Sequence, residues 1–218
     1  RKEFLGNVSH EIKTPIFTLQ GYIVTLLDGA IEDKAVNRKY LERSEKNIDR
    51  LIHIVDDLEE ISKLEAGAPV LEKECFDVVA LVREIADSLE MDAARRRIGI
   101  RVGNPHGQPP VPVTADRRRI AQVITNLLSN SIKYGREGGE TRIGCVDMFD
   151  RVLVAVKENS PRVFERFFRV DKSRSREQGG TGLGLAIVKH ILEAHGERIT
   201  LRSKLGEGSA FSFTLSKK

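Results

Sequence analysis

Apolar residues recur at steps of three and four through residues 1–66, and this spacing restricts the region to helices packed along one face. Two such seams occur, separated by the polar run at residues 28–34. The first contains Leu5, Val8, Ile12, Ile16, Leu19, Ile23 and Leu26, and the second contains Leu41, Ile48, Leu51, Val55, Leu58 and Ile61. Because two helices cannot bury both seams alone, the sequence predicts a helical hairpin that pairs with a second copy in a four-helix bundle.

Beyond the hairpin the pattern changes to a mixture of helical and strand-like segments. Gly67 and Pro69 end the second helix, and Asp116 is expected to cap a later one. Helices are predicted at 78–95, after Asp116 and at 183–194, with a loop at 103–112 and strands at 98–102, 141–148, 152–157, 199–202 and 210–215. This order lacks strict βαβ repetition, which favours an α+β sandwich of sheet and helices. We therefore predict a hairpin domain at 1–66, a linker at 67–75 and a second domain at 76–218.

Composition excludes several classes of protein. The 218 residues carry a net charge of only +4, and the basic triplets lie in helical patterns that indicate solvated faces, so nucleic-acid binding is not expected. Apolar runs are too short to span a bilayer. Cys75 and Cys145 show neither metal-ligand spacing nor a disulfide pattern. The first residues look like the interior of a helix, so we expect a fragment of a longer protein.

A histidine with reactive neighbours lies early in the first helix, in the segment SHEIKTP. His10 points away from the apolar seam, and a solvent-facing neutral imidazole is a competent nucleophile near pH 7. Glu11 is placed to accept the imidazole proton, and Thr14 lies one turn further on the same face, where it can orient a water. Pro15 removes a backbone donor, so a kink is expected beside His10. The alternative is an ordinary surface histidine. The other histidines are interpreted as structural or exposed: His53, His106, His190 and His195.

Two further segments indicate phosphate and metal chemistry. Asn126, Asn130 and Lys133 share one helical face, and amide oxygens are hard ligands that suit Mg²⁺. The glycine-rich run at 179–185 allows close approach to phosphates at the start of the following helix. It is neither a P-loop nor, since a polar segment precedes it, a dinucleotide motif. The polar stretch at 171–178 is predicted to form a mobile lid over bound nucleotide.

The segment FLGNVSHEIKTP resembles the phosphoacceptor motif of sensor histidine kinases. NLLSNSIKYG, FERFFRVD and GGTGLGLAIVK follow in the order found in the ATP-binding domain of that family. The resemblance covers nearly the whole chain and looks closest to the phosphate-sensing type of membrane kinase. It implies a dimeric four-helix bundle followed by an α/β sandwich of the histidine-kinase, chaperone and mismatch-repair ATPase type, with ATP and Mg²⁺ as cofactors.

The resemblance also implies a reaction and roles for individual residues. His10 takes a phosphoryl group from ATP with the help of Glu11 and Thr14, and passes it to an aspartate of a response-regulator receiver domain. Glu11 and Thr14 further imply dephosphorylation of that regulator. Asn130 is the implied Mg²⁺ ligand, and the implied nucleotide-binding residues are Asn126, Asn130, Lys133, Tyr134, Glu158, Arg169, Gly180, Thr181, Gly182, Leu183 and Gly184. The implied setting is a homodimer in the cytoplasmic portion of an inner-membrane protein, with membrane contact only through absent upstream segments.

One box of the family pattern departs from expectation. Where the family carries D-x-G-x-G, this chain has Glu158 at the acidic position without the glycines, and the interval to the phenylalanine segment is short by about ten residues. Either disordered residues were left out of the sequence, which the intact neighbouring motifs favour, or the chain lacks them and binds ATP poorly. A docking module with a degenerate ATP domain is therefore one alternative function. An ATPase of the chaperone and mismatch-repair type is another, although it does not need His10.

Overall fold

The computed structural model describes residues 2–65, 70–104, 109–158, 183–204 and 208–217. They divide into two compact units, the first formed by the N-terminal helices and the second by the remaining helices and the strands. None of the described helices combines the length and apolar content needed to cross a lipid bilayer.

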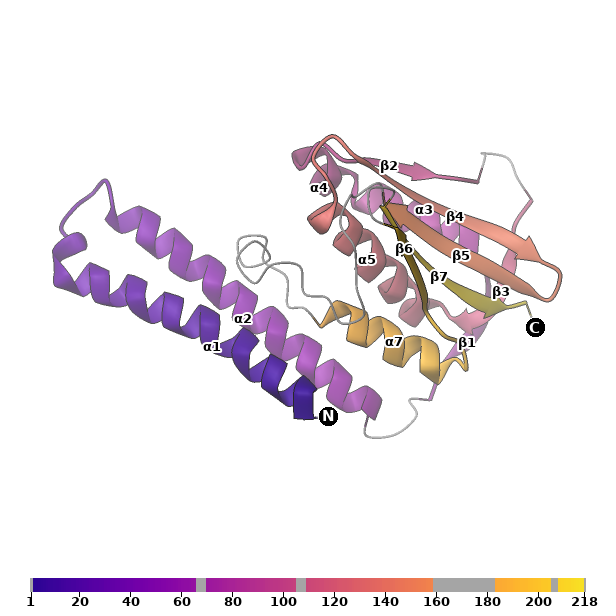
Figure 1. Ribbon diagram of the computed structural model, residues 1–218, viewed down its shortest axis with the longest axis horizontal. Helices are drawn as coiled ribbons and strands as arrows, with labels where there is room; N and C mark the ends of the chain where they lie inside the picture. Colours follow the sequence, from indigo (N-terminus) through magenta and orange to yellow (C-terminus); the bar gives the residue numbers. More distant parts are fainter. Residues whose placement is uncertain (1, 66–69, 105–108, 159–182, 205–207, 218) are drawn as a thin grey trace. The chain divides into compact units, whose positions relative to one another are not determined.

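The first unit is a helical hairpin, as the two seams predict. Helix α1 (Lys2–Thr25) and helix α2 (Asn37–Glu65) run antiparallel and are joined through one π-helical turn, η1 (Leu26–Ala30) (Figure 1). Gly29 has a φ of 112°, a conformation that favours glycine, and it lets the chain turn. The rings of Tyr22 and Tyr40 lie 5.5 Å apart and pack the helices together near this turn. Helix α1 continues through Pro15, so the proline does not end it.

The hairpin leaves much of both apolar seams exposed. Val8, Leu26 and Ile61 are buried. Five other seam residues, all large and apolar, are between 45% and 57% exposed: Ile16, Ile23, Leu41, Ile48 and Val55. Several large apolar side chains exposed along two helices are typical of an interaction surface.

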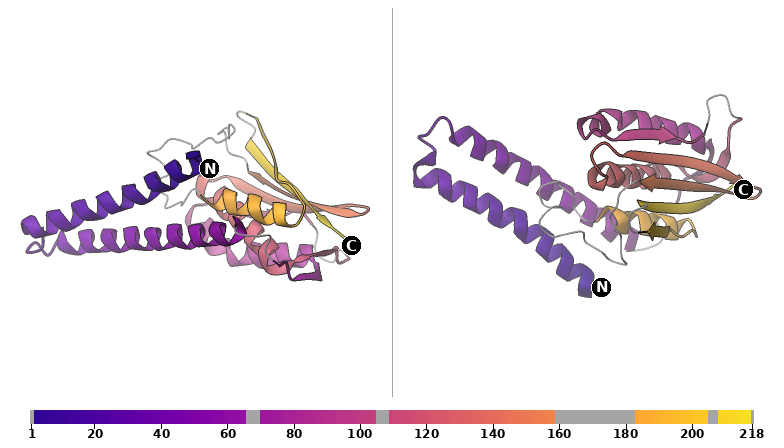
Figure 2. Two further views of the ribbon diagram at one scale, coloured as in Figure 1. Left: turned by 90° about the horizontal axis from the view of Figure 1, so that it is seen from below. Right: turned by 45° about the horizontal axis from the view of Figure 1, so that its top comes forward.

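The second unit is an α+β sandwich, which confirms the predicted fold class. Its five-stranded sheet has the order β2-β4-β5-β7-β6, with β2 parallel to β4 and the other neighbours antiparallel. The strands are β2 (Gly99–Val102), β4 (Glu140–Met148), β5 (Arg151–Glu158), β6 (Thr200–Lys204) and β7 (Gly208–Ser216). Helices α3 (Val78–Ser88), α5 (Arg117–Tyr134) and α7 (Gly184–Ala194) lie side by side along the sheet (Figures 1 and 2). Alternate residues of β5, from Val152 to Glu158, are buried.

Two short strands were not predicted from the sequence. β1 (Lys73–Asp77) and β3 (Pro112–Asp116) form a separate antiparallel pair, and residues 73–75 of β1 fall within the stretch predicted as a linker. Each strand leads directly into a helix capped by its last aspartate. The Oδ1 atoms of Asp77 and Asp116 accept backbone N–H groups from Val79 and Arg119, both at 3.0 Å. The helix predicted at 78–95 is also divided, into α3 and α4 (Glu90–Arg95).

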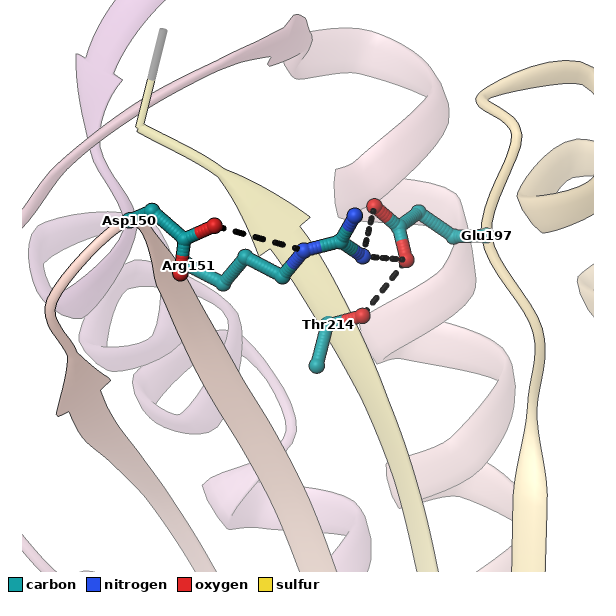
Figure 3. A network of polar contacts seen from close by, with 4 residues as sticks. All are labelled: Asp150, Arg151, Glu197 and Thr214. Carbon is teal, nitrogen blue, oxygen red and sulfur yellow. Dashed lines mark hydrogen bonds and ion pairs between the residues drawn. The ribbon is translucent and has the colours of Figure 1, made fainter.

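The chain after helix α7 is bonded to the sheet by a network of polar contacts around the buried Glu197 (Figure 3). Gly196, with a φ of 76°, ends the helix in the left-handed conformation. The carboxylate of Glu197 then accepts hydrogen bonds from Arg151 Nη1 at 3.1 and 3.2 Å and from Thr214 Oγ1 at 2.5 Å. Arg151 begins β5 and Thr214 lies in β7, so the connection after α7 is held to two neighbouring strands.

Candidate functional site

His10 lies on α1 with its side chain exposed, as its position off the apolar seam predicts. Beside it, Glu11 Oε2 forms an ion pair with Arg50 Nη2 of α2 at 3.0 Å, and the two side chains are only 18% and 10% exposed. The pair joins the two helices next to His10 and fixes where the Glu11 carboxylate lies. Arg50 was not identified from the sequence, because nothing in a single sequence pairs residues so far apart.

Thr14 lies one turn after His10, as predicted. Its Oγ1 hydroxyl donates a hydrogen bond to the His10 carbonyl oxygen at 3.0 Å. The hydroxyl hydrogen is therefore committed to the backbone, and a water beside His10 would meet the oxygen lone pairs of Thr14.

In the second unit, the first residue of α7 meets two asparagines of α5. A Cβ atom at Gly184 would lie 3.5 Å from Asn126 Oδ1 and 3.9 Å from Asn130 Nδ2, so both amides face the N-terminal end of α7. Asn126 Nδ2 is buried and has no hydrogen-bond partner among the described residues. The structure thus brings together Asn126, Asn130 and Gly184, and it leaves one amide donor there unsatisfied.

A row of polar groups occupies one end of the buried core. Thr141, Glu158 and Ser209 lie side by side on β4, β5 and β7, and all three are buried. Ser131 of α5 joins them, with its Oγ 2.5 Å from Thr141 Oγ1 and a hydrogen bond to Glu158. Sequence reasoning missed Ser131, Thr141 and Ser209. The signal for Ser131 was its position between Leu128 and Ile132 on the apolar face of α5.

The carboxyl group of Glu158 has a raised pKa, and one of its oxygens has no hydrogen-bond partner among the described residues. Burial raises the pKa of its carboxyl group from 4.5 to about 7, while the hydrogen bond from Ser131 acts in the opposite direction. Its Oε1 atom is buried without a hydrogen-bond partner in the described part of the chain. A buried acceptor of this kind fits a ligand that brings an N–H group.

The remaining predicted site residues fall into two groups. Lys133 and Tyr134 lie half-buried at the end of α5, with Lys133 Nζ 6.0 Å from the centre of the Tyr134 ring, and Leu183 is buried just before α7. Arg169, Gly180, Thr181 and Gly182 lie outside the described residues, as does the predicted lid at 171–178.

The donor set of the second unit fits an adenine nucleotide. Glu158 offers an unsatisfied acceptor for an amino group, and Asn126 offers an unsatisfied donor. Gly184 keeps the N-terminal end of α7 open, where backbone N–H groups and the helix dipole favour phosphate. Amide oxygens of the asparagines suit Mg²⁺.

Comparison with protein families gives two matches. Residues 1–67 match the His Kinase A (phospho-acceptor) domain, and residues 115–218 match the histidine kinase-, DNA gyrase B- and HSP90-like ATPase family. The sensor histidine kinase WalK of Bacillus subtilis is 36% identical over 228 residues, which takes in all of this chain. This chain belongs to the sensor histidine kinases of two-component systems.

Solved histidine kinases share the fold. ThkA, in a crystal structure with the response regulator protein TrrA, is 29% identical with a TM-score of 0.79, covering 99% of this chain and 61% of that one. Acinetobacter baumannii AdeS is 27% identical with a TM-score of 0.73, covering 96% of this chain and 98% of that one. The kinase chain spans only part of the length of its curated relatives: 37% of B. subtilis WalK and 36% of the WalK of Staphylococcus epidermidis.

The shortened box of this histidine kinase follows Glu158 and agrees with the alignment to its relatives. The sequence of 218 residues runs from Glu158 through Asn159 directly to Ser160, and residues 159–182 lie outside the described part of the chain, so the two explanations, omitted residues and a true deletion, both stay predictions. The alignment with WalK covers 228 residues against 218 in this chain, a difference of 10. That difference agrees in size with the missing interval predicted after Glu158.

Proposed function

We propose that this chain is the catalytic portion of a sensor histidine kinase that phosphorylates His10 from ATP and transfers the phosphoryl group to an aspartate of a response regulator. Two observations in the second unit support the proposal. Asn126 and Asn130 face Gly184 at the start of α7. The buried Glu158 has a carboxyl oxygen, Oε1, without a hydrogen-bond partner among the described residues. An exposed histidine on the helical hairpin supplies the acceptor.

Each residue of the second unit has a part in holding the nucleotide. Glu158 Oε1 accepts a hydrogen bond from the adenine amino group. Backbone N–H groups at Gly184 bind phosphate oxygens, and Lys133 neutralises phosphate charge while Tyr134 packs near the nucleotide. Asn130, supported by Asn126, would hold Mg²⁺, which supplies charge neutralisation between the phosphates when bound.

His10 then acts as the nucleophile. A ring nitrogen lone pair attacks the γ-phosphorus in line, the bond to the ADP oxygen breaks, and the ring gives up its proton to Glu11. The ion pair with Arg50 holds the Glu11 carboxylate in one place on α1, at the residue next to His10. We propose that Thr14 orients a water in a separate reaction, in which that water attacks the phosphorus of the regulator's aspartyl phosphate and releases inorganic phosphate and the free aspartate.

The exposed apolar seams support a homodimer. Pairing two hairpins would cover Ile16, Ile23, Leu41, Ile48 and Val55 in a four-helix bundle. The solved complex of ThkA with TrrA supports a response regulator as the partner. We further propose that the chain has three functional parts: the phosphoacceptor hairpin at 1–66, a linker at 67–75 and the ATP-binding domain at 76–218. We also propose that the chain derives from a membrane sensor. The phosphate-sensing subtype stays a prediction.

Nucleotide binding by the purified chain tests this proposal against the docking-module alternative. We expect the non-hydrolysable analogue AMPPNP to bind with Mg²⁺ at micromolar concentration, about −8 kcal/mol, in isothermal titration. Affinity that cannot be detected at millimolar analogue would favour the docking module.

The raised pKa of Glu158 predicts pH-dependent nucleotide binding. The ionised carboxylate accepts the adenine amino hydrogen better than the protonated group, so affinity should fall as pH decreases through about 7. Between about pH 8 and pH 6 the loss for a single proton at this pKa is about tenfold. Titrations at saturating Mg²⁺ measure it. Glu158→Gln cannot titrate and should show weaker but flatter binding, and parallel pH profiles for the two proteins would contradict the assignment.

A further inference from the structure

His195, the residue after α7, joins that helix to the start of α5. Its Nδ1 lies 2.8 Å from the Ile191 carbonyl oxygen, and its Nε2 lies 3.1 Å from the backbone N of Asp116. The carbonyl can only accept and the backbone N–H can only donate. The two partners therefore fix a neutral ring that donates from Nδ1 and accepts at Nε2.

Asp116 is a junction of three segments. Its Oδ1 caps α5 by accepting the Arg119 N–H at 3.0 Å, and its Oδ2 accepts the Glu72 N–H at 3.3 Å. The residue is 5% exposed and ends strand β3. His195 thus binds a point that is itself fixed by hydrogen bonds in several directions.

The contact between α5 and α7 is otherwise mainly apolar. Helix α7 buries Ile187, Val188, Ile191 and Leu192. Apolar contacts are non-directional, so they oppose separation of the helices more strongly than a shift along their axes. A directional hydrogen bond at one end is suited to set that axial register.

The other end of the same pair carries the nucleotide residues. Because Gly184 lies against Asn126 and Asn130 while His195 lies against Asp116, the two helices are antiparallel. An α-helix is stiff over its 11 residues, so a displacement at His195 appears at Gly184. The space between Gly184 and Asn126 is small, and a misplacement of about 1 Å is enough to impair a reacting site.

We propose that His195 is a positioning residue that sets the register of α7 along α5 and thereby places Gly184 against Asn126 and Asn130. The inference rests on the proposed function in one respect, that Gly184, Asn126 and Asn130 bind ATP. Glu197 complements His195, since it holds the chain two residues further on to the sheet rather than to α5 (Figure 3).

Two substitutions separate the hydrogen bonds of the imidazole. The amide of His195→Gln reaches the position of Nε2 and can still accept from Asp116, whereas that of His195→Asn reaches only the position of Nδ1 and keeps the Ile191 bond. Asn104→Ala is the control for lost stability alone. It removes two hydrogen bonds to the Cys145 backbone, at 2.7 and 2.9 Å, between the end of β2 and β4.

Two measurements follow for each variant. In the nucleotide-free protein, NMR reports the side-chain amide signals of Asn126 and Asn130 and the backbone amide of Gly184. We expect them to shift in His195→Asn and to stay near wild type in His195→Gln and Asn104→Ala. Isothermal titration with AMPPNP and Mg²⁺ should then show affinity about tenfold lower in His195→Asn alone, the effect of one lost hydrogen bond.

The outcomes distinguish the two proposals. Unshifted signals in His195→Asn, or equal effects in His195→Asn and His195→Gln, would overturn the positioning role. Weakening by Asn104→Ala as large as that by His195→Asn would also overturn it, because general destabilisation would then explain the loss. If wild type binds no AMPPNP, the proposed function fails, while the NMR comparison still decides the role of His195.

Discussion

Replacing His10 with glutamine is expected to abolish the transfer of label from γ-labelled ATP to the protein. The amide nitrogen of glutamine has no available lone pair, so the γ-phosphorus loses its nucleophile while a planar polar group of similar length remains. Because His10 is exposed, the change removes no core contact and should leave the fold intact. We expect the rate of labelling to fall by more than about a thousandfold.

The matched control is His53→Gln, the same substitution at another exposed histidine of the hairpin, on α2. It should label at the wild-type rate. The bond formed should be acid-labile, as expected of a phosphorylated imidazole. Equal labelling of wild type and His10→Gln would rule out the assignment, and ATP hydrolysis without any labelled protein would favour the chaperone-type ATPase.

Replacing Asn130 with alanine is expected to remove the stimulation of nucleotide binding by Mg²⁺. The amide is half-buried beside Gly184, at the start of the helix assigned to the phosphates. Without its oxygen, Mg²⁺ would lose the protein ligand proposed to hold it, and with it the charge neutralisation that it would supply beside the phosphates. We expect Mg²⁺-dependent affinity for AMPPNP to fall about a hundredfold, the upper range for groups that support a bound metal.

The conservative variant Asn130→Asp keeps an oxygen ligand in the same place and should retain most of the stimulation. Titrations with Mg²⁺ and with EDTA give the stimulation factor for each protein. An unchanged factor in Asn130→Ala would show that the metal is bound elsewhere.

The helical hairpin was predictable because its apolar seams repeat with the period of a helix, a property of the sequence alone. The asparagines of α5 and the glycines before α7 were recognisable because the resemblance joins segments that composition cannot join. The strands β1 and β3 were missed since each gains its stability from pairing with the other, and the two lie far apart in the sequence. The cap at Asp116 was predicted, but its bond to His195 was not.

Contacts between distant residues account for the other omissions. The ion pair of Glu11 with Arg50 joins two helices, and the hydrogen bond of Ser131 with Thr141 joins a helix to a strand. Local pattern carries no information on such pairs. The departure from the family motif after Glu158 was visible in the sequence. The burial of Glu158 beside other polar residues was not, because it depends on how the strands pair in the sheet.

Helix α7 is held unevenly along its length. Its C-terminal side is secured in two directions, toward the strands by Glu197 and toward α5 by His195, whereas its opposite end begins with a residue that has no side chain. The helix is therefore expected to move less at its C-terminal end than at its N-terminal end. If the proposed nucleotide site is right, binding of a polyphosphate should displace the N-terminal end of α7 more than its C-terminal end, and the bonds of His195 and Glu197 should return the helix to the same position after release.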